Sequence, residues 1–174
     1  MRSLTVPSIK NLLPLLPLLL LCSGCYTFRG ISIDPDVETF FIQPFEMQAS
    51  NAPPNVGFDF VEKLKQKIRT ETRLTLKNSG PDVEFSGKVT DFRVTPVAPK
   101  PGELVSLNRL DVTIRVNYVS NKNEKKSWTA ERDFRHFAEF SNDKDLLNIQ
   151  NQLLSETIFP QLLEDVFNAA FNDW

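Results

Sequence analysis

Two cysteines, one histidine and six glycines among 174 residues leave this chain with little of what most catalytic sites use. His136 has no second histidine with which to form a metal pair or a catalytic triad. Neither a GxxxxGKS/T loop nor a GxGxxG loop occurs, which excludes the common phosphate-cradling turns. We therefore expect no enzyme activity, no metal and no cofactor, and we interpret His136 as a structural or surface residue.

An excess of basic residues is also missing. The chain has 20 Lys+Arg against 22 Asp+Glu, which gives a formal net charge of −2. Proteins that bind nucleic acid usually carry a clear basic excess. We therefore expect no nucleic-acid partner.

The chain has no apolar run long enough to span a membrane, but its first 24 residues have the pattern of a secretory signal peptide. Arg2 and Lys10 precede a leucine-rich stretch at 12–21, and small residues follow it before Cys25. That stretch covers ten residues and includes two prolines. A bilayer-spanning helix needs about 20 apolar residues, so we predict a signal peptide at 1–24 instead of an anchor.

Cys25 ends a Cys-Ser-Gly-Cys segment that resembles a bacterial lipobox, in which the cut falls just before the cysteine that receives the lipid. Cys22 stands where an aliphatic residue is usual. The alternative is a secreted protein with Cys25 as a free thiol, which is a liability in an oxidising compartment. We expect acylation of Cys25, because two or three acyl chains at about 0.8 kcal/mol per buried methylene hold a protein on a membrane.

Removing 24 of the 174 residues leaves 150, enough for a single domain at 25–174 with its own core. No disulfide is then available, so the fold depends on hydrophobic packing. The chain has 14 Phe, and aromatic side chains bury the most area per residue.

The sequence pattern in the first half of this domain predicts a strand followed by a helix. Residues 37–45 form a β-rich run that Pro44 ends or confines to an edge. Asn55 is a plausible N-cap for an amphipathic helix at 56–71. Its expected buried stripe consists of Phe58, Val61, Leu64 and Ile68. The opposite face is either solvated or a patch for anionic lipid phosphates, and it carries Glu62, Lys63, Lys65, Lys67 and Arg69.

A short strand at 74–77 and a long strand at about 83–94 follow. The apolar parity changes between Val89 and Phe92, which indicates a β-bulge. Residues 95–102 are too rich in proline to pair in a sheet, and we predict a stiff projecting loop that includes Ala98 and Lys100.

The clearest alternation lies at 110–118, where every second residue is apolar, which predicts a strand buried on one face and wet on the other. A polar turn at 120–126 leads to a return strand at about 127–140. Its expected inner side chains are Trp128, Ala130, Phe134, Ala138 and Phe140.

A long helix at about 143–171 completes the pattern, with cap residues at 141–145. Pro160 lies inside it and costs about 3 kcal/mol in a free helix, so we predict a kink near 156–157. Together these elements predict an α+β fold with two helices packed on one face of a roughly four-stranded, mostly antiparallel sheet.

Six stretches of the chain together resemble the LptE-like lipoproteins, the lipopolysaccharide-assembly lipoproteins of Gram-negative outer membranes. They are GCYTFRGISI, FFIQPF, FVEKLKQKIRTETRLTL, VEFSGKVTDFRVTPVAP, LNRLDVTIRVNYV and LEDVFNAAFNDW. The resemblance implies a lipoprotein lodged partly within the LptD β-barrel, which it helps assemble and plugs while lipopolysaccharide passes to the outer leaflet. It also implies a two-helix, roughly four-stranded fold. Pro160 departs from the ordinary helix former expected there.

With this resemblance in hand, we expect an outer-membrane, lipid-anchored domain that faces the periplasm, since no acidic residue follows Cys25 directly. The candidate contacts with the barrel or lipopolysaccharide are on the polar strand face and the projecting loop. They are Arg109, Thr113, Arg115, Ala98 and Lys100. A plain solvated sheet face is the alternative for these residues. For the whole protein, the alternative is an accessory lipoprotein of another envelope transport or secretion complex.

Overall fold

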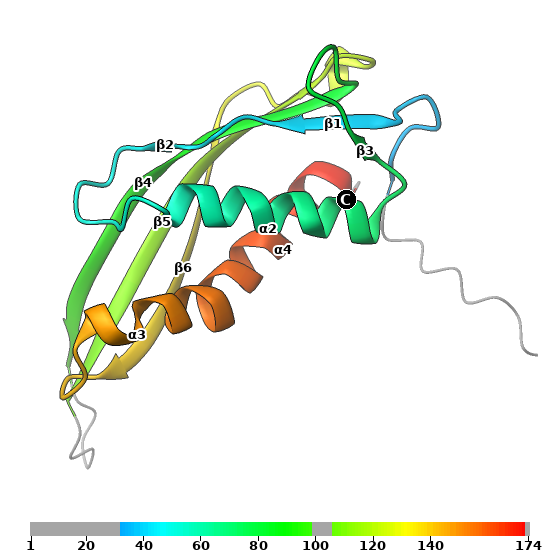
Figure 1. Cartoon of the computed structure of the whole chain (residues 1–174). Helices are drawn as coiled ribbons and strands as arrows, with labels where there is room; N and C mark the ends of the chain where they lie inside the picture. The colour runs from blue at the N-terminus through cyan, green and yellow to red at the C-terminus, as the bar shows by residue number, and fades with distance from the viewer. Residues whose placement is uncertain (1–31, 99–105, 173–174) are drawn as a thin grey trace, which may run out of the picture.

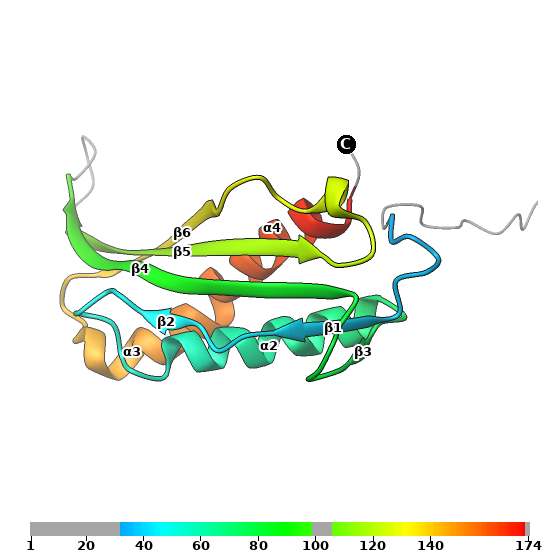
Figure 2. The same ribbon diagram turned by 90° about the horizontal axis from the view of Figure 1, so that it is seen from above.

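The computed structural model describes residues 32–98 and 106–172. Its elements in chain order are β1 (Thr39–Ile42), β2 (Glu46–Met47), α2 (Val56–Glu71), β3 (Thr75–Leu76), β4 (Val83–Val97), β5 (Leu107–Ser120), η2 (Glu124–Lys126), β6 (Arg132–Ser141), α3 (Leu146–Gln152), η3 (Leu153–Ile158) and α4 (Phe159–Phe171). One curved sheet holds both helical segments on its concave face (Figure 1). Seen from above, α2 lies along β1 and the α3–η3–α4 run crosses the sheet obliquely (Figure 2).

The α+β class with two helical segments on one face is confirmed, but the expected four-stranded, mostly antiparallel sheet is wrong. The sheet has six strands in the order β3-β1-β4-β5-β6, with β2 also paired to β4. The pairs β1–β3, β1–β4 and β2–β4 are parallel, whereas β4–β5 and β5–β6 are antiparallel. The sheet is mixed because α2 carries the chain back along the sheet, so that β3 adds beside β1 in the same direction.

The strand expected at 37–45 is divided in two. The N–H of Gln43 still donates to the carbonyl of Phe85 at 2.8 Å, but the chain then leaves the ladder at Pro44 and pairs again at Glu46. Proline has no N–H to donate to a ladder. The Phe45 ring meanwhile packs against Gly87 of β4, where an added Cβ would lie 2.7 Å from it.

Helix α2 has the predicted bounds, but one residue of its predicted stripe is wrong. Phe58 is 67% exposed and Phe60 is fully buried. Residues two positions apart in the chain lie about 200° apart around a helix. Phe58 and Phe60 therefore cannot both face the sheet. The Phe60 ring packs between Phe45 and Phe159, with centroids 5.6 and 5.7 Å away.

The bulge in β4 is confirmed, with a register shift between Val89 and Asp91. The projecting loop expected at 95–102 is wrong for its first residues, because β4 continues to Val97 and Pro96 pairs with Asn108. Strand β2 leaves β4 at Val89, so β4 is an edge beyond the bulge, where a proline is tolerated. Of the rest of that loop, Ala98 is exposed and 99–102 lie outside the described residues.

The alternation of β5 is confirmed, and its inner face is fully closed. The buried residues are Leu110, Val112, Ile114, Val116 and Tyr118. The return strand starts at Arg132, later than expected. The Trp128 side chain is nevertheless buried. Its backbone N–H donates to the backbone carbonyl of Tyr118 at 3.0 Å. Ala130, expected on the inner face, is exposed, because residues 127–131 are outside the ladder.

The C-terminal helix is interrupted where a kink was predicted. The six residues of η3 form a π-helical segment directly before α4, and Pro160 lies in the first turn of α4. A proline ring collides with the carbonyl four residues earlier in an α-helix, and the wider π turn relieves this collision. The side chains of Leu154 and Ile158 stay buried through the change, so the apolar stripe remains continuous. Asp145 caps α3 by accepting from the N–H of Leu147 at 3.1 Å.

Candidate functional site

Because both helical segments pack on one side, the other side of the β4–β5–β6 ladder is open. We call this side the outer face. Strand β5 contributes its predicted polar residues to it, and the antiparallel register places a β6 residue beside each one. The pairs are Arg109 with Glu139, Asp111 with Phe137, Thr113 with Arg135, and Arg115 with Asp133.

Arg115 and Arg109 are both held by carboxylates on β6. The Arg115 Nε and Nη2 atoms donate to the two carboxylate oxygens of Asp133 at 2.6 and 2.9 Å. The hydrogen bonds from Arg115 lower the pKa of Asp133, and the same contact raises the pKa of Arg115. Arg109 donates to Glu139 Oε1 at 2.6 Å and its guanidinium lies 4.2 Å from the ring centre of Phe137.

Asp111 lies on the outer face, as the alternation of β5 predicts, but it is not exposed to solvent as expected. Only 3% of Asp111 is exposed, because neighbours from both adjacent strands reach it. Arg135 donates to its Oδ1 at 2.7 Å, and the Thr95 hydroxyl lies 3.4 Å from its Oδ2. A buried carboxylate is stable only when it is paired in this way.

The outer face is therefore a polar surface with fixed donors and acceptors and little net charge. It suits contact with another polar protein surface better than capture of a phosphate, since its arginines already have carboxylate partners. Phe137 lies on this face, 48% exposed, and was not among the predicted contacts. The two-residue period of β6 places it opposite the buried Ala138, so the signal was present in the sequence.

The structure brings Arg109, Thr113 and Arg115 together on the outer face. Ala98 is exposed just after β4, at the end of the sheet where β4 ends and β5 begins (Figure 1). Lys100 lies outside the described residues, so its part in a contact stays a prediction.

Two of the four cations on the polar face of α2, Lys65 and Lys67, form ion pairs within the domain. Lys65 pairs with Glu62 at 2.8 Å, and Lys67 pairs with Glu71 and with Glu164 of α4, both at 2.7 Å. Burial opposes the charge of Lys67, but the hydrogen bonds to both carboxylates outweigh it and the pKa of Lys67 is raised. Lys67 thus joins α2 to α4.

His136 joins β6 to α4, with its Nε2 atom 2.7 Å from Asp165 Oδ2. This contact agrees with the structural interpretation of the residue. Within 32–98 and 106–172, no group of three His, Cys, Asp or Glu side chains could hold a metal ion. No helix in the same ranges is long and apolar enough to cross a membrane.

Comparisons with known structures found weak likenesses. A minor lipoprotein from Acinetobacter baumannii is 12% identical, over 77% of this chain and 90% of that chain, with a TM-score of 0.46. A hypothetical protein from Chlamydia trachomatis is 10% identical, over 76% and 97%, with a TM-score of 0.46. Lipoprotein B from Nitrosomonas europaea is 13% identical, over 80% and 88%, with a TM-score of 0.44.

No curated protein matches the chain. The family assignment comes from a sequence model. The model described as LptE, lipopolysaccharide-assembly, matches residues 37–170, which is nearly the whole described domain. Members of this family are non-enzymatic lipoproteins connected with lipopolysaccharide assembly. The chain belongs to the LptE family.

Proposed function

We propose that this protein is an outer-membrane lipoprotein that partners an LptD-like β-barrel, helps assemble and plug it, and supports delivery of lipopolysaccharide to the outer leaflet. The observation that carries this proposal is the LptE match over residues 37–170. The architecture supports it, because a sheet covered on one face only leaves a long polar surface available to a partner.

The outer face is the contact surface that we propose for the barrel. The lumen of a large outer-membrane barrel is polar, and the paired arginines of β5 offer hydrogen-bonding groups without a buried unpaired charge. Phe137 adds an exposed aromatic side chain, a residue type that often anchors interfaces. The end of the sheet where β4 ends and β5 begins lies at the opposite end of the described domain from the start of the described chain (Figure 1). A domain tethered through its N-terminal side could therefore insert its far end into the barrel.

Site-specific photo-crosslinking in intact cells tests this surface. A crosslinking amino acid at positions 98, 113 and 115 should give an adduct with a barrel protein. The same amino acid at position 65, on α2, is the matched control and should give none. Adducts from position 65 alone would show that the helices face the partner instead.

We also propose that Cys25 carries the acyl chains and anchors the domain to the membrane. Incorporation of labelled palmitate and intact-mass measurement test this directly. Cys25→Ser should abolish the label and Cys22→Ser should keep it, since only Cys25 remains after the expected cut. Label that persists in Cys25→Ser would refute the assignment.

A further inference from the structure

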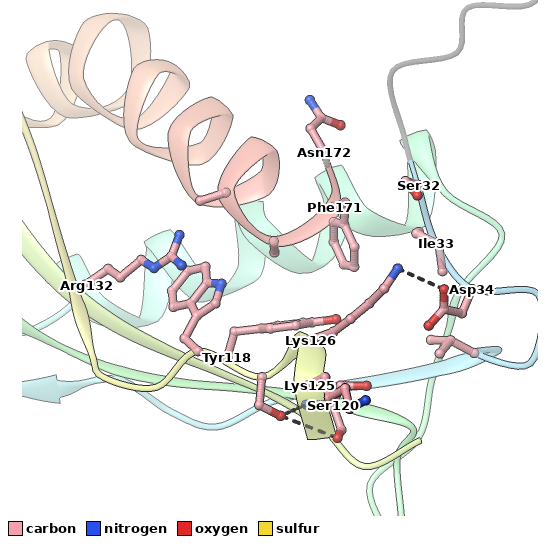
Figure 3. A pocket seen from close by; sticks show the side chains of 15 residues that line it. Ser32, Ile33, Asp34, Tyr118, Ser120, Lys125, Lys126, Arg132, Phe171 and Asn172 are labelled. Carbon is pink, nitrogen blue, oxygen red and sulfur yellow. Dashed lines mark hydrogen bonds and ion pairs between the residues drawn. The ribbon is translucent and has the colours of Figure 1, made fainter. Parts of the chain in front are cut away.

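A cavity of about 390 Å³ lies at the end of the domain where the described chain begins. It lies between the turn that contains η2, the start of the described chain at 32–34 and the end of α4 (Figure 3). Three aromatic rings line it. Tyr118 is at the centre of this group, with its ring centre 5.8 Å from Trp128 and 6.1 Å from Phe171. Aromatic side chains therefore form one wall of the cavity, and polar side chains form its rim.

The rim carries three cationic side chains and one carboxylate: Lys125, Lys126, Arg132 and Asp34. Lys126 donates to Asp34 Oδ1 at 2.8 Å (Figure 3). That hydrogen bond, together with one from Asn123, lowers the pKa of Asp34. The carboxylate is thus satisfied inside the protein and does not neutralise the other two cations.

Lys125 and Arg132 differ from the cations of the outer face. Arg109, Arg115 and Arg135 each have a carboxylate partner. In the part of the chain that the structure describes, neither Lys125 nor Arg132 forms an ion pair. The guanidinium of Arg132 instead lies 4.5 Å from the ring centre of Trp128. Stacking of this kind holds the planar group in place while its N–H donors stay available.

The aromatic wall and the two cations without carboxylate partners indicate the chemistry of a ligand. An anionic group beside Arg132 would meet N–H donors that no carboxylate of the described residues occupies. The Oδ1 atom of Asn172 is buried and is therefore closed to a ligand in the cavity.

The position of the cavity suggests where such a ligand comes from. The N–H of Ser32 donates to the carbonyl of Phe171 at 2.7 Å, so the chain meets the domain at the cavity wall. Cys25 and Ser32 are seven positions apart, and seven extended residues reach at most about 25 Å. If Cys25 is acylated, as we propose above, the cavity cannot lie far from the membrane surface.

We propose that this cavity binds the headgroup of an anionic membrane phospholipid, with Arg132 on the phosphate and Lys125 adding positive charge elsewhere on the rim. An arginine fork matches phosphate geometry, and basic groups near a membrane attract anionic headgroups. Headgroup binding at this end fixes the orientation of the tethered domain, with the β4–β5 end directed away from the anchor.

Calorimetric titration of the mature, detergent-solubilised protein with dihexanoyl-phosphatidylglycerol, a water-soluble lipid, tests the proposal. We expect saturable binding that weakens at least tenfold in Lys125→Gln/Arg132→Gln. Arg132→Lys should retain part of the affinity. The matched control Lys65→Gln, on α2, should bind as the wild type does. Circular dichroism melting checks each variant, and Lys125→Gln alone, at an exposed position, provides a second test if the double variant unfolds.

Two results would overturn the proposal. One is equal affinity in the wild type and the double variant. The other is inorganic phosphate competing as tightly as the lipid, which would mean that the cavity takes a free anion instead of a headgroup. The soluble lipid reports on the cavity whether or not Cys25 is acylated. A failure of the palmitate experiment with intact lipid binding would therefore remove only the anchor.

Discussion

Asp82 connects the start of β4 to the start of β1 through a set of short hydrogen bonds. Its Oδ2 accepts from the N–H of Glu38 at 3.0 Å and from the N–H and hydroxyl of Thr39 at 2.9 and 2.8 Å. The bond from the Glu38 N–H is the main cause that lowers the pKa of Asp82 to about 2. The parallel β1–β4 pairing therefore depends on an ionised carboxylate.

We predict that Asp82→Asn destabilises the domain in a pH-dependent way. Hydrogen bonds to a charged group contribute about 1.5–3 kcal/mol, so we expect a loss of about 2 kcal/mol at pH 7. A carboxylate whose pKa is lower in the folded state stabilises fully above its unfolded pKa, and this contribution is lost as the pH falls from about 4 towards 2. Urea unfolding at pH 7, 4 and 2.5 should show the difference shrinking. A constant difference, or an equal loss in the exposed Asp143→Asn control, would contradict this.

Gly87 lies where β4 passes beneath the Phe45 ring. A Cβ at this position would lie 2.5 Å from the carbonyl oxygen of Arg115 and 2.7 Å from the Phe45 ring. Since one of these neighbours is backbone, the strand itself must move. We predict that Gly87→Ala costs about 1–3 kcal/mol, the usual cost of overpacking, in urea unfolding. Ser86→Ala, the adjacent control, should change little. Equal midpoints for both variants would show that the pairing at Gly87 is looser than described.

At the scale of elements, the long amphipathic segments were predictable and the short ones were not. The period of α2 and the alternation of β5 extend over many residues, so the type of each element and most of its buried face follow from pattern alone. Strands β2 and β3 have two residues each and provide no period. Phe58 was misplaced because a large apolar residue one turn before Val61 fits a three-residue step, whereas the packing selects Phe60.

The candidate site was predictable only in part, for a related reason. Alternation along β5 identifies Arg109 and Arg115 as outer-face residues. It contains no information on cross-strand register, so the Glu139 and Asp133 partners could not be found. The cavity lined by Asp34, Lys126 and Asn172 was also out of reach, because it joins residues far apart in the chain.

The C-terminal helical run provides the main cover of the sheet, and Leu162 on α4 is fully buried. Burying an unpaired carboxylate there costs several kcal/mol, a large part of the 5–15 kcal/mol that typically stabilises a domain. We predict that Leu162→Asp unfolds the protein or greatly lowers its melting temperature, measured by circular dichroism. The neighbouring exposed residue provides the control Gln161→Asp, which should melt close to the wild type. A Leu162→Asp protein that melts within a few degrees of the wild type would place this helix face in solvent.

At the scale of the whole molecule, the two ends of the sheet have different character. One end carries the start of the described chain and the basic, aromatic-lined cavity. At the other end, β4 ends and β5 begins, far from the start of the described chain (Figure 1). The outer face runs between them with its arginines paired to carboxylates. This polarity fits a domain tethered at one end that inserts the other into a partner.

Affinity purification from envelope membranes tests that account most directly. The wild-type protein, tagged at its C-terminus and extracted in mild detergent, should bring down an LptD-like barrel protein together with lipopolysaccharide. Gln161→Asp should retain both, because its change lies on the solvent side of α4. Recovery of an inner-membrane transporter or a secretin complex without the barrel would contradict the account and assign the protein to a different envelope machine.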